Sequence, residues 1–153
     1  MAAAKVWLFK SEPHVFSIDD LKAKKKVVWD GVRNYTARNF LRDEVKVGDA
    51  VLYYHSSCPE PGIAGLATVV RVGFPDPLAF DKDSQYYDPK SDPAAPRWFS
   101  VEIAFKAKAR QLISLPWLRE QHPDLLMFKL NRLSIVPLTA AQGRQLMTLK
   151  GHW

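Results

Sequence analysis

The sequence predicts an α+β protein in which a small curled β-sheet or open barrel is flanked by short helices. Strand-like segments are spread along the whole chain with short helical segments between them, and their spacing is not that of regular βαβ units. Closure of the sheet would remove its exposed edges. A chain of 153 residues has the length of one domain, since two units would each be near the lower limit for burying a core. We therefore expect a single domain over residues 1–153.

Turn and cap signals divide the first part of the chain into elements. The apolar run at residues 6–9 is typical of a buried strand. Ser17 opens a capping-box pattern, so a helix begins there, and the short apolar run at residues 27–29 predicts a second strand. An Asp-Gly turn then leads to Asn34, a residue type that caps helices well, so we expect a second helix that runs to Arg42.

Alternation of apolar and polar residues predicts the strands that follow. Residues 50–55 and 63–74 are rich in aromatic and β-branched residues, and we expect these two strands to pair. Residues 98–109 alternate over most of their length and form a third strand. Residues 75–97 carry five of the eleven prolines and no glycine, which predicts a stiff extended loop of a length that is usually functional.

The C-terminal part has weaker signals. Short helical pieces are expected at residues 114–121 and 124–128, and a closing strand at residues 133–137. Thr139 then caps a last helix that runs to about residue 149.

Composition and charge narrow the class of protein. Hydrophobic residues make up 47% and charged residues 25%, as in ordinary globular proteins, and no apolar run is long enough to span a membrane. The N-terminal segment lacks the apolar core of a secretory signal. The formal net charge is +6, with basic flanks around an acidic insert at residues 76–92, and this balance favours a polyanionic partner. We expect a cytoplasmic monomer, nucleoid-associated in a bacterium or nuclear in a eukaryote, that does not bind a membrane.

Templates for catalysis and metal binding are absent from the sequence. It has no glycine-rich nucleotide cradle, no zinc-protease helix and no hydrolase elbow. Cys58 is the one cysteine, which excludes an intrachain disulfide and a cysteine-rich zinc site. We expect neither a metal nor a cofactor. An enzyme that acts on a modified nucleoside or nucleotide stays open as an alternative, with an acid or base among Lys10, Glu12, Asp30 and His55.

Polar and aromatic side chains gather where strands and helices end, which is where proteins carry binding groups. Aromatic faces stack on a nucleobase that leaves its duplex, and asparagine, serine and histidine bond its polar edge. The competing interpretation is structural. Under it, three tryptophans are core residues and three arginines form a solvated helix face, namely Trp7, Trp29 and Trp98, and Arg33, Arg38 and Arg42.

Five segments, in order along nearly the whole chain, resemble the EVE domain of the PUA-like superfamily. They are WLFKSEP (residues 7–13), WDGVRNYTARNFLRD (29–43), YYHSSCPEPGIAGLATVV (53–70), YYDPKSDPAAPRW (86–98) and LSIVPLT (133–139). The resemblance implies a small PUA-like β-barrel with flanking helices, related to YTH and ASCH domains. It also implies a pocket for a methylated or hydroxymethylated cytosine and no catalytic centre, with the long loop as a wall of that pocket.

Carried over by motif, the resemblance implies a set of base-pocket residues. They are Lys10, Ser11, Trp29, Asn34, Arg38, Asn39, Tyr54, His55, Ser56 and Trp98. We expect the phosphates to be bound by the basic residues that flank this pocket, which are Lys10, Arg33 and Arg38. The expected partner is DNA with a modified base flipped into the pocket. RNA stays open as an alternative, because the choice depends on a contact to the 2′-hydroxyl.

The polar edge of a cytosine presents a donor beside acceptors, and the asparagine amide supplies the complement to both. We therefore expect Asn34 or Asn39, together with Ser11 or His55, to bind that edge. The rival interpretation is that Asn34 only caps its helix and Asn39 only bonds neighbouring backbone.

Overall fold

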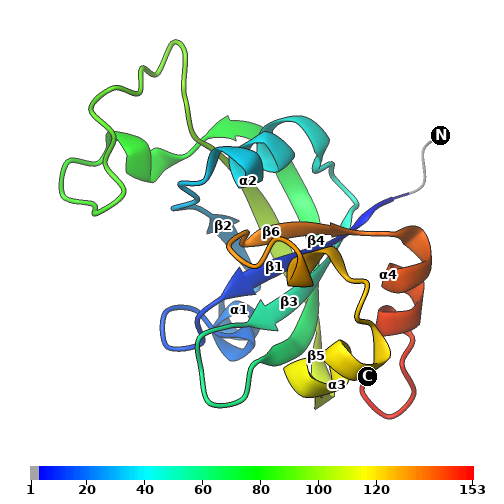
Figure 1. Ribbon diagram of the computed structural model, residues 1–153. Coiled ribbons are helices and arrows are strands. Elements are labelled where there is room, and N and C mark those ends of the chain that lie inside the picture. Colours follow the sequence, from blue (N-terminus) through cyan, green and yellow to red (C-terminus); the bar gives the residue numbers. More distant parts are fainter. Residues whose placement is uncertain (1–3) are drawn as a thin grey trace.

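The computed structural model describes residues 4–153, and a six-stranded mixed sheet lies at its centre (Figure 1). The strands are β1 (Val6–Ser11), β2 (Lys26–Trp29), β3 (Ala50–His55), β4 (Gly62–Pro75), β5 (Phe99–Ser114) and β6 (Ile135–Leu138). They lie in the order β2-β5-β4-β3-β1-β6. All neighbouring pairs are antiparallel except β1 and β3, which are parallel. The predicted α+β class is confirmed.

Short helices connect the strands, and two of them begin with the capping boxes that the sequence predicts. The helices are α1 (Ile18–Lys24), α2 (Tyr35–Asn39), α3 (Leu115–Gln121) and α4 (Ala140–Met147), with a π-helical turn at Phe40–Glu44 and 3-10 turns at Pro77–Phe80 and Leu126–Phe128. Ser17 and Thr139 close the capping boxes of α1 and α4. The helix expected over residues 124–128 is only a 3-10 turn, because the segment is too short to propagate an α-helix.

The sheet is curled so strongly that a side chain of its edge strand β2 contacts side chains of β1 and β3. In the strand order β2 is four places from β1, which in a flat sheet would be about 19 Å. The ring centroid of Trp29 in β2 nevertheless lies 5.3 Å from that of Phe9 in β1 and 5.5 Å from that of Tyr53 in β3. Register irregularities between β4 and β5 accompany this bend. The barrel stays open, because β2 and β6 do not pair with each other.

The largest fully buried side chains of the core come from β1 and β3. Trp7 and Tyr53 have no exposed surface. The indole N–H of Trp7 donates to the buried Asp49 carboxylate at 2.9 Å, and the backbone N–H groups of Lys5 and Lys46 donate to it at 3.0 and 2.9 Å. Three donors compensate this carboxylate for its lost hydration, and they join the start of β1 to the turn before β3.

The long loop between β4 and β5 is a series of turns and not the extended segment that its prolines predict. It leaves the sheet beside α2 and β2 (green in Figure 1). The carboxylates of Asp81, Asp88 and Asp92 each accept a hydrogen bond from the backbone N–H two residues further on. Such aspartate turns fold the backbone locally, which explains why the insert is acidic.

Two further observations bear on the kind of protein. No helix within residues 4–153 is long and apolar enough to cross a membrane. The same part of the chain brings no group of three or more histidine, cysteine, aspartate or glutamate side chains together as a metal site.

Candidate functional site

The parallel pairing of β1 and β3 brings predicted site residues together at the ends of these strands. Lys10 lies opposite Tyr54, and Ser11 lies opposite His55. Successive side chains of a strand point to opposite faces of the sheet, so the pairs Lys10–Tyr54 and Ser11–His55 leave the strands in different directions. Of these four residues, Lys10, Ser11 and Tyr54 line one or both of two cavities, and His55 lines neither.

A larger cavity, of about 520 Å³, lies on the side of Lys10 and Tyr54. It is closed by α3 and by the segment that leads to β6, which contribute Arg119, Phe128 and Arg132. Ser11 and Ser56 also line it. Burial lowers the pKa of Lys10 and raises the pKa of Tyr54 to about 12. The Tyr54 hydroxyl, like that of an ordinary tyrosine, is protonated at neutral pH and able to donate a hydrogen bond.

A smaller cavity, of about 240 Å³, lies against β2 and the start of α1. Among its lining residues are Ser11, Phe16, Trp29 and Asp30. The Trp29 ring is fixed by its contacts with Phe9 and Tyr53 described above, so its position needs no ligand. Because Ser11 lines both hollows, the smaller and the larger cavity adjoin each other at this residue.

Polar groups of the smaller cavity are partly engaged by the protein itself. The Ser11 hydroxyl donates to the carbonyl oxygen of Phe16 at 2.9 Å, and the Tyr53 hydroxyl donates to the same oxygen at 2.6 Å. Asp30 lies at the rim, where loss of hydration and, to a smaller extent, the Asp76 carboxylate raise its pKa. Asp30 therefore gains from any ligand that donates a hydrogen bond to it.

His55 supports α1 and lines neither of these cavities. Its Nε2 accepts the backbone N–H of Ile18 at 3.1 Å, at the beginning of α1. Burial lowers the pKa of His55, the nearby Lys108 lowers it further, and Asp19 raises it. The accepting nitrogen requires the neutral ring, so the pKa direction and the hydrogen bond agree.

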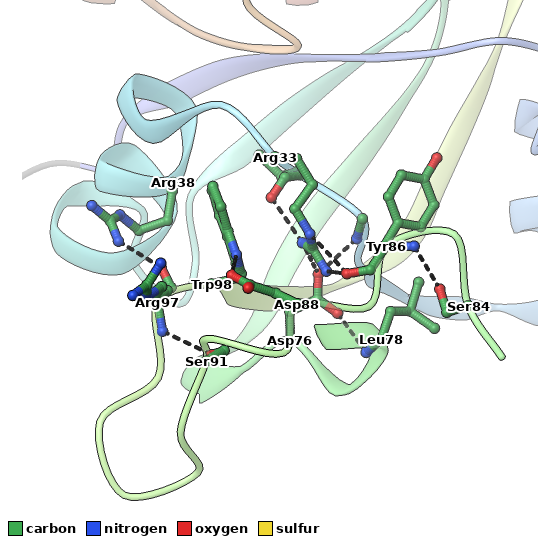
Figure 2. Close-up of polar contacts among 12 residues, drawn as sticks. Arg33, Arg38, Asp76, Leu78, Ser84, Tyr86, Asp88, Ser91, Arg97 and Trp98 are labelled. Carbon is green, nitrogen blue, oxygen red and sulfur yellow. Dashed lines mark hydrogen bonds and ion pairs between the residues drawn. The ribbon is translucent and has the colours of Figure 1, made fainter. Parts of the chain in front are cut away.

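Trp98 belongs to a separate cluster that fastens the long loop to α2, as Figure 2 shows. The indole is 6% exposed, stacks on Tyr35 with ring centroids 4.8 Å apart, and donates its N–H to Asp88 at 2.7 Å. The guanidinium groups of Arg33 and Arg38 lie 5.1 and 5.9 Å from its ring centroid. Both faces and the polar edge of this tryptophan thus meet neighbours within the protein.

Arg33 forms a partly buried ion pair in the same cluster. It donates to the Asp76 carboxylate at 2.8 Å and to the backbone oxygen of Tyr86 at 3.1 and 2.7 Å (Figure 2). Asp76 has no exposed surface and also accepts the backbone N–H of Gly31 at 2.7 Å. The ion pair therefore fixes the loop against the turn that carries Asp30.

The two asparagines of α2 make local hydrogen bonds. The Asn34 side chain accepts the backbone N–H of Ala37 at 3.1 Å and caps α2, as its rival interpretation proposed. The Asn39 side chain accepts from Arg38 at 2.8 Å, and Arg38 also donates to the backbone oxygen of Arg97. Neither asparagine lines the larger or the smaller cavity, and their role as base readers stays a prediction.

The predicted site residues therefore fall into separate places. The residues that line the cavities are Lys10, Ser11, Trp29, Tyr54 and Ser56. The residues of the Trp98 cluster and of α2 are Arg33, Asn34, Arg38, Asn39 and Trp98. Sequence reasoning missed Phe16, Arg119, Phe128 and Arg132, because isolated residues in short helices and turns carry no local pattern. The signals near them are the capping box that begins directly after Phe16 and the LSIVPLT segment that begins directly after Arg132.

The fold and these cavities define a small α+β module with an aromatic hollow beside a cationic one. The model of the EVE domain matches residues 5–149, so the chain belongs to the EVE domain family. Human thymocyte nuclear protein 1 is 40% identical over 165 residues, which cover 94% of this chain and 73% of the human protein. The resemblance expected from the sequence is confirmed.

Solved structures agree with this assignment. A hypothetical protein from Leishmania major is 44% identical and superposes with a TM-score of 0.90, covering 95% of this chain and 93% of that one. The human THYN1 protein, solved in complex with DNA containing 5-methylcytosine, is 40% identical and also has a TM-score of 0.90. That comparison covers 97% of this chain and 98% of the human one.

Proposed function

We propose that this protein is a DNA-binding module that recognises a modified cytosine, most simply 5-methylcytosine, without changing it chemically. The observation that carries the proposal is the human relative solved with DNA that contains 5-methylcytosine, which matches 97% of this chain at a TM-score of 0.90. Fold and function can separate among distant relatives, but 40% identity over nearly the whole chain supports a shared ligand class.

The smaller cavity is the proposed seat of the base, which leaves the duplex to reach it. Trp29 and Phe16 offer aromatic surface, and stacking on such surface is worth about 1–3 kcal/mol per base. Because Trp29 is already held by Phe9 and Tyr53, little side-chain freedom is lost on binding. The gain offsets much of the unstacking cost of a few kcal/mol.

Asp30 is the proposed reader of the exocyclic amino group of cytosine. An aspartate carboxylate accepts hydrogen bonds from this amino group, and Asp30 lies at the rim of the same cavity as Trp29. Thymine carries the methyl group of 5-methylcytosine but has a carbonyl oxygen in place of the amino group. The Asp30 carboxylate therefore favours 5-methylcytosine over thymine, whereas shape around the methyl group decides between methylated and plain cytosine.

Lys10 is the proposed phosphate contact beside the base. It lines the adjoining cavity, and within residues 4–153 its ammonium group has one distant acceptor, the Asn131 carbonyl oxygen at 3.5 Å. The phosphate role expected for Arg33 and Arg38 is less well supported, because both guanidinium groups are bonded within the Trp98 cluster.

The test is a binding series with otherwise identical oligonucleotides that carry cytosine, 5-methylcytosine, 5-hydroxymethylcytosine or thymine at one position, each as DNA and as RNA. We expect one chain to bind per site, with 5-methylcytosine DNA bound most tightly. Asp30→Asn should reduce the preference over thymine by about ten-fold or more, since a hydrogen bond to a charged group is lost. The matched control is Asp83→Asn in the exposed part of the long loop.

Equal binding of methylated and plain cytosine by the wild-type protein would refute the proposal. Tighter binding of the RNA series would move the ligand class to RNA. Chromatography of the oligonucleotide after digestion to nucleosides should recover unchanged 5-methylcytosine, and any turnover would favour the enzymatic alternative.

A further inference from the structure

We propose that the larger cavity binds a second nucleotide, the direct neighbour of the modified one, with its base against Phe128 and its phosphate among Lys10, Arg119 and Arg132. The inference rests on the proposed function, because the first base has to occupy the smaller cavity. It adds a second subsite and gives the protein a preference for one side of the modified nucleotide.

The positions of the two cavities favour this second subsite. Both cavities are lined by Ser11, and Lys10 precedes it on the wall of the larger one. A strand whose base sits against Trp29 therefore passes Ser11 when it continues in this direction. The larger cavity has about 520 Å³ against about 240 Å³ for the smaller one, which leaves space for a sugar and phosphate in addition to a base.

Positive charge is in excess among the residues that line the larger cavity. Lys10, Arg119 and Arg132 contribute three cations to the larger cavity, and Glu12 is the carboxylate among its lining residues. Glu12 lies 3.0 Å from the His14 ring outside. Within residues 4–153, Arg119 and Arg132 form no ion pair. Three cations against one carboxylate leave an excess of positive charge that attracts an anion, and phosphate is the anion that arginine and lysine bind in nucleic acids.

The larger cavity also has apolar surface beside these cations. Leu115, Met127 and Leu133 line the cavity together with the Phe128 ring, and Arg119 lies 6.0 Å from the centroid of that ring. A free phosphate leaves such a surface unused, and an apolar molecule leaves the cations unused. A nucleotide uses both, since its base has flat faces for stacking and its phosphate is charged.

The Tyr54 hydroxyl adds specificity for a polar ligand. It lines the same cavity, and as a phenol that is protonated at neutral pH it is a hydrogen-bond donor. The bases and the phosphate both offer acceptors for this proton. Tyr54 is therefore expected to contact the second nucleotide without distinguishing among bases.

The experiment compares 5-methyl-deoxycytidine monophosphate with the two dinucleotides that extend it by one nucleotide, on the 5′ or on the 3′ side. We expect one of the two dinucleotides to bind about ten-fold more tightly than the mononucleotide, the gain that one stacked base provides. The other dinucleotide should gain less than two-fold, since only one direction leads past Ser11.

Two variants test the residues. Arg119→Ala removes an exposed cation, and Phe128→Leu keeps apolar volume but removes the ring; each should reduce the ten-fold gain to about three-fold or less. Arg144→Ala, on the outside of α4, is the matched control and should keep the full gain. Thermal unfolding of each variant shows whether it is folded. If Phe128→Leu is not folded, the result for Arg119→Ala tests the second subsite by itself.

The outcomes separate this inference from the proposed function. If neither dinucleotide binds more tightly than the mononucleotide, or if Arg119→Ala keeps the gain as Arg144→Ala does, the second subsite is refuted while the preference for 5-methylcytosine over thymine persists. If that preference is missing in the wild-type protein, the proposed function fails, and the second subsite fails with it.

Discussion

Two regions of this molecule pair tryptophan with basic residues, and they differ in whether the protein satisfies its own polar groups. Around Trp98, the indole N–H, the Arg33 guanidinium and the Asp76 carboxylate all find partners within the chain. Around Trp29, the cavities retain a rim carboxylate and several cations that have few or no partners. A tryptophan near basic residues thus belongs to a structural cluster in one region and to a candidate binding surface in the other. Hydrogen-bond satisfaction distinguishes them, and residue type does not.

The largest expected effect, on the free energy of unfolding, comes from disrupting the Trp98 cluster. Trp98→Ala should lower the free energy of unfolding by about 3–5 kcal/mol, the usual cost of removing a buried aromatic side chain. The folded fraction should retain its preference for 5-methylcytosine, because Trp98 lines neither cavity. Urea unfolding and oligonucleotide binding measure the two quantities.

Tyr87→Ala, an exposed aromatic residue of the same loop, is the control for the Trp98 variant and should cost less than about 1 kcal/mol. If Trp98→Ala proved as stable as this control and lost the methylcytosine preference, Trp98 would be a base reader. The distinction between the Trp98 cluster and the cavities beside Trp29 would then be wrong.

A smaller effect, on oligonucleotide affinity, is expected in the region of the cavities. Lys10→Ala should weaken binding of all oligonucleotides by a similar factor and reduce the slope of log affinity against log salt by about 0.7–0.9, the change for one lost phosphate contact. Affinities measured over a series of salt concentrations give the slope. Lys22→Ala on the exposed face of α1 should leave it unchanged, and an equal change at Lys22 would place the nucleic acid along α1.

The smallest expected effect concerns the support beneath the smaller cavity. The pKa of His55 is lowered in the folded protein, so the unfolded chain takes up the proton first as pH falls. Stability should therefore decrease as pH falls through about 6.5, the ordinary pKa of histidine. His55→Gln keeps an acceptor for the Ile18 N–H and should remove this part of the pH dependence, about 1 kcal/mol or less.

Urea unfolding of the wild-type protein and of His55→Gln between pH 5 and pH 8 checks this prediction, with the difference between them as the measured quantity. Parallel curves would mean that the ring is not held neutral by its contact with α1.

The sequence predicts the elements of this fold well, because their signals are local. Ser17, Asn34 and Thr139 cap helices as their positions indicate, and alternation locates β5. The curled, open sheet was also expected, but the places where it bends were not, since they depend on register irregularities distributed between β4 and β5. No residue pattern within either strand reports its register with the other.

The candidate site was predicted only in part, for a similar reason. The motifs at the strand ends suggested that Lys10, Ser11 and Tyr54 lie together, but not the parallel pairing of β1 and β3 that brings them together. Whether Arg33 faces a phosphate or a carboxylate depends on Asp76, which lies 43 residues away in the sequence. Such long-range partners decide which charges are free, and they become visible only in the folded structure.

The turns of the long loop also have a consequence for the direction from which a polyanion approaches. Asp81, Asp83 and Asp92 are exposed in this loop, which extends beside α2 and away from α3 (Figure 1). Exposed charges act over a screening length of about 8 Å at physiological salt. The loop thus repels a polyanion locally while the cationic cavity attracts it, so under the proposed function a nucleic acid strand is steered toward that cavity.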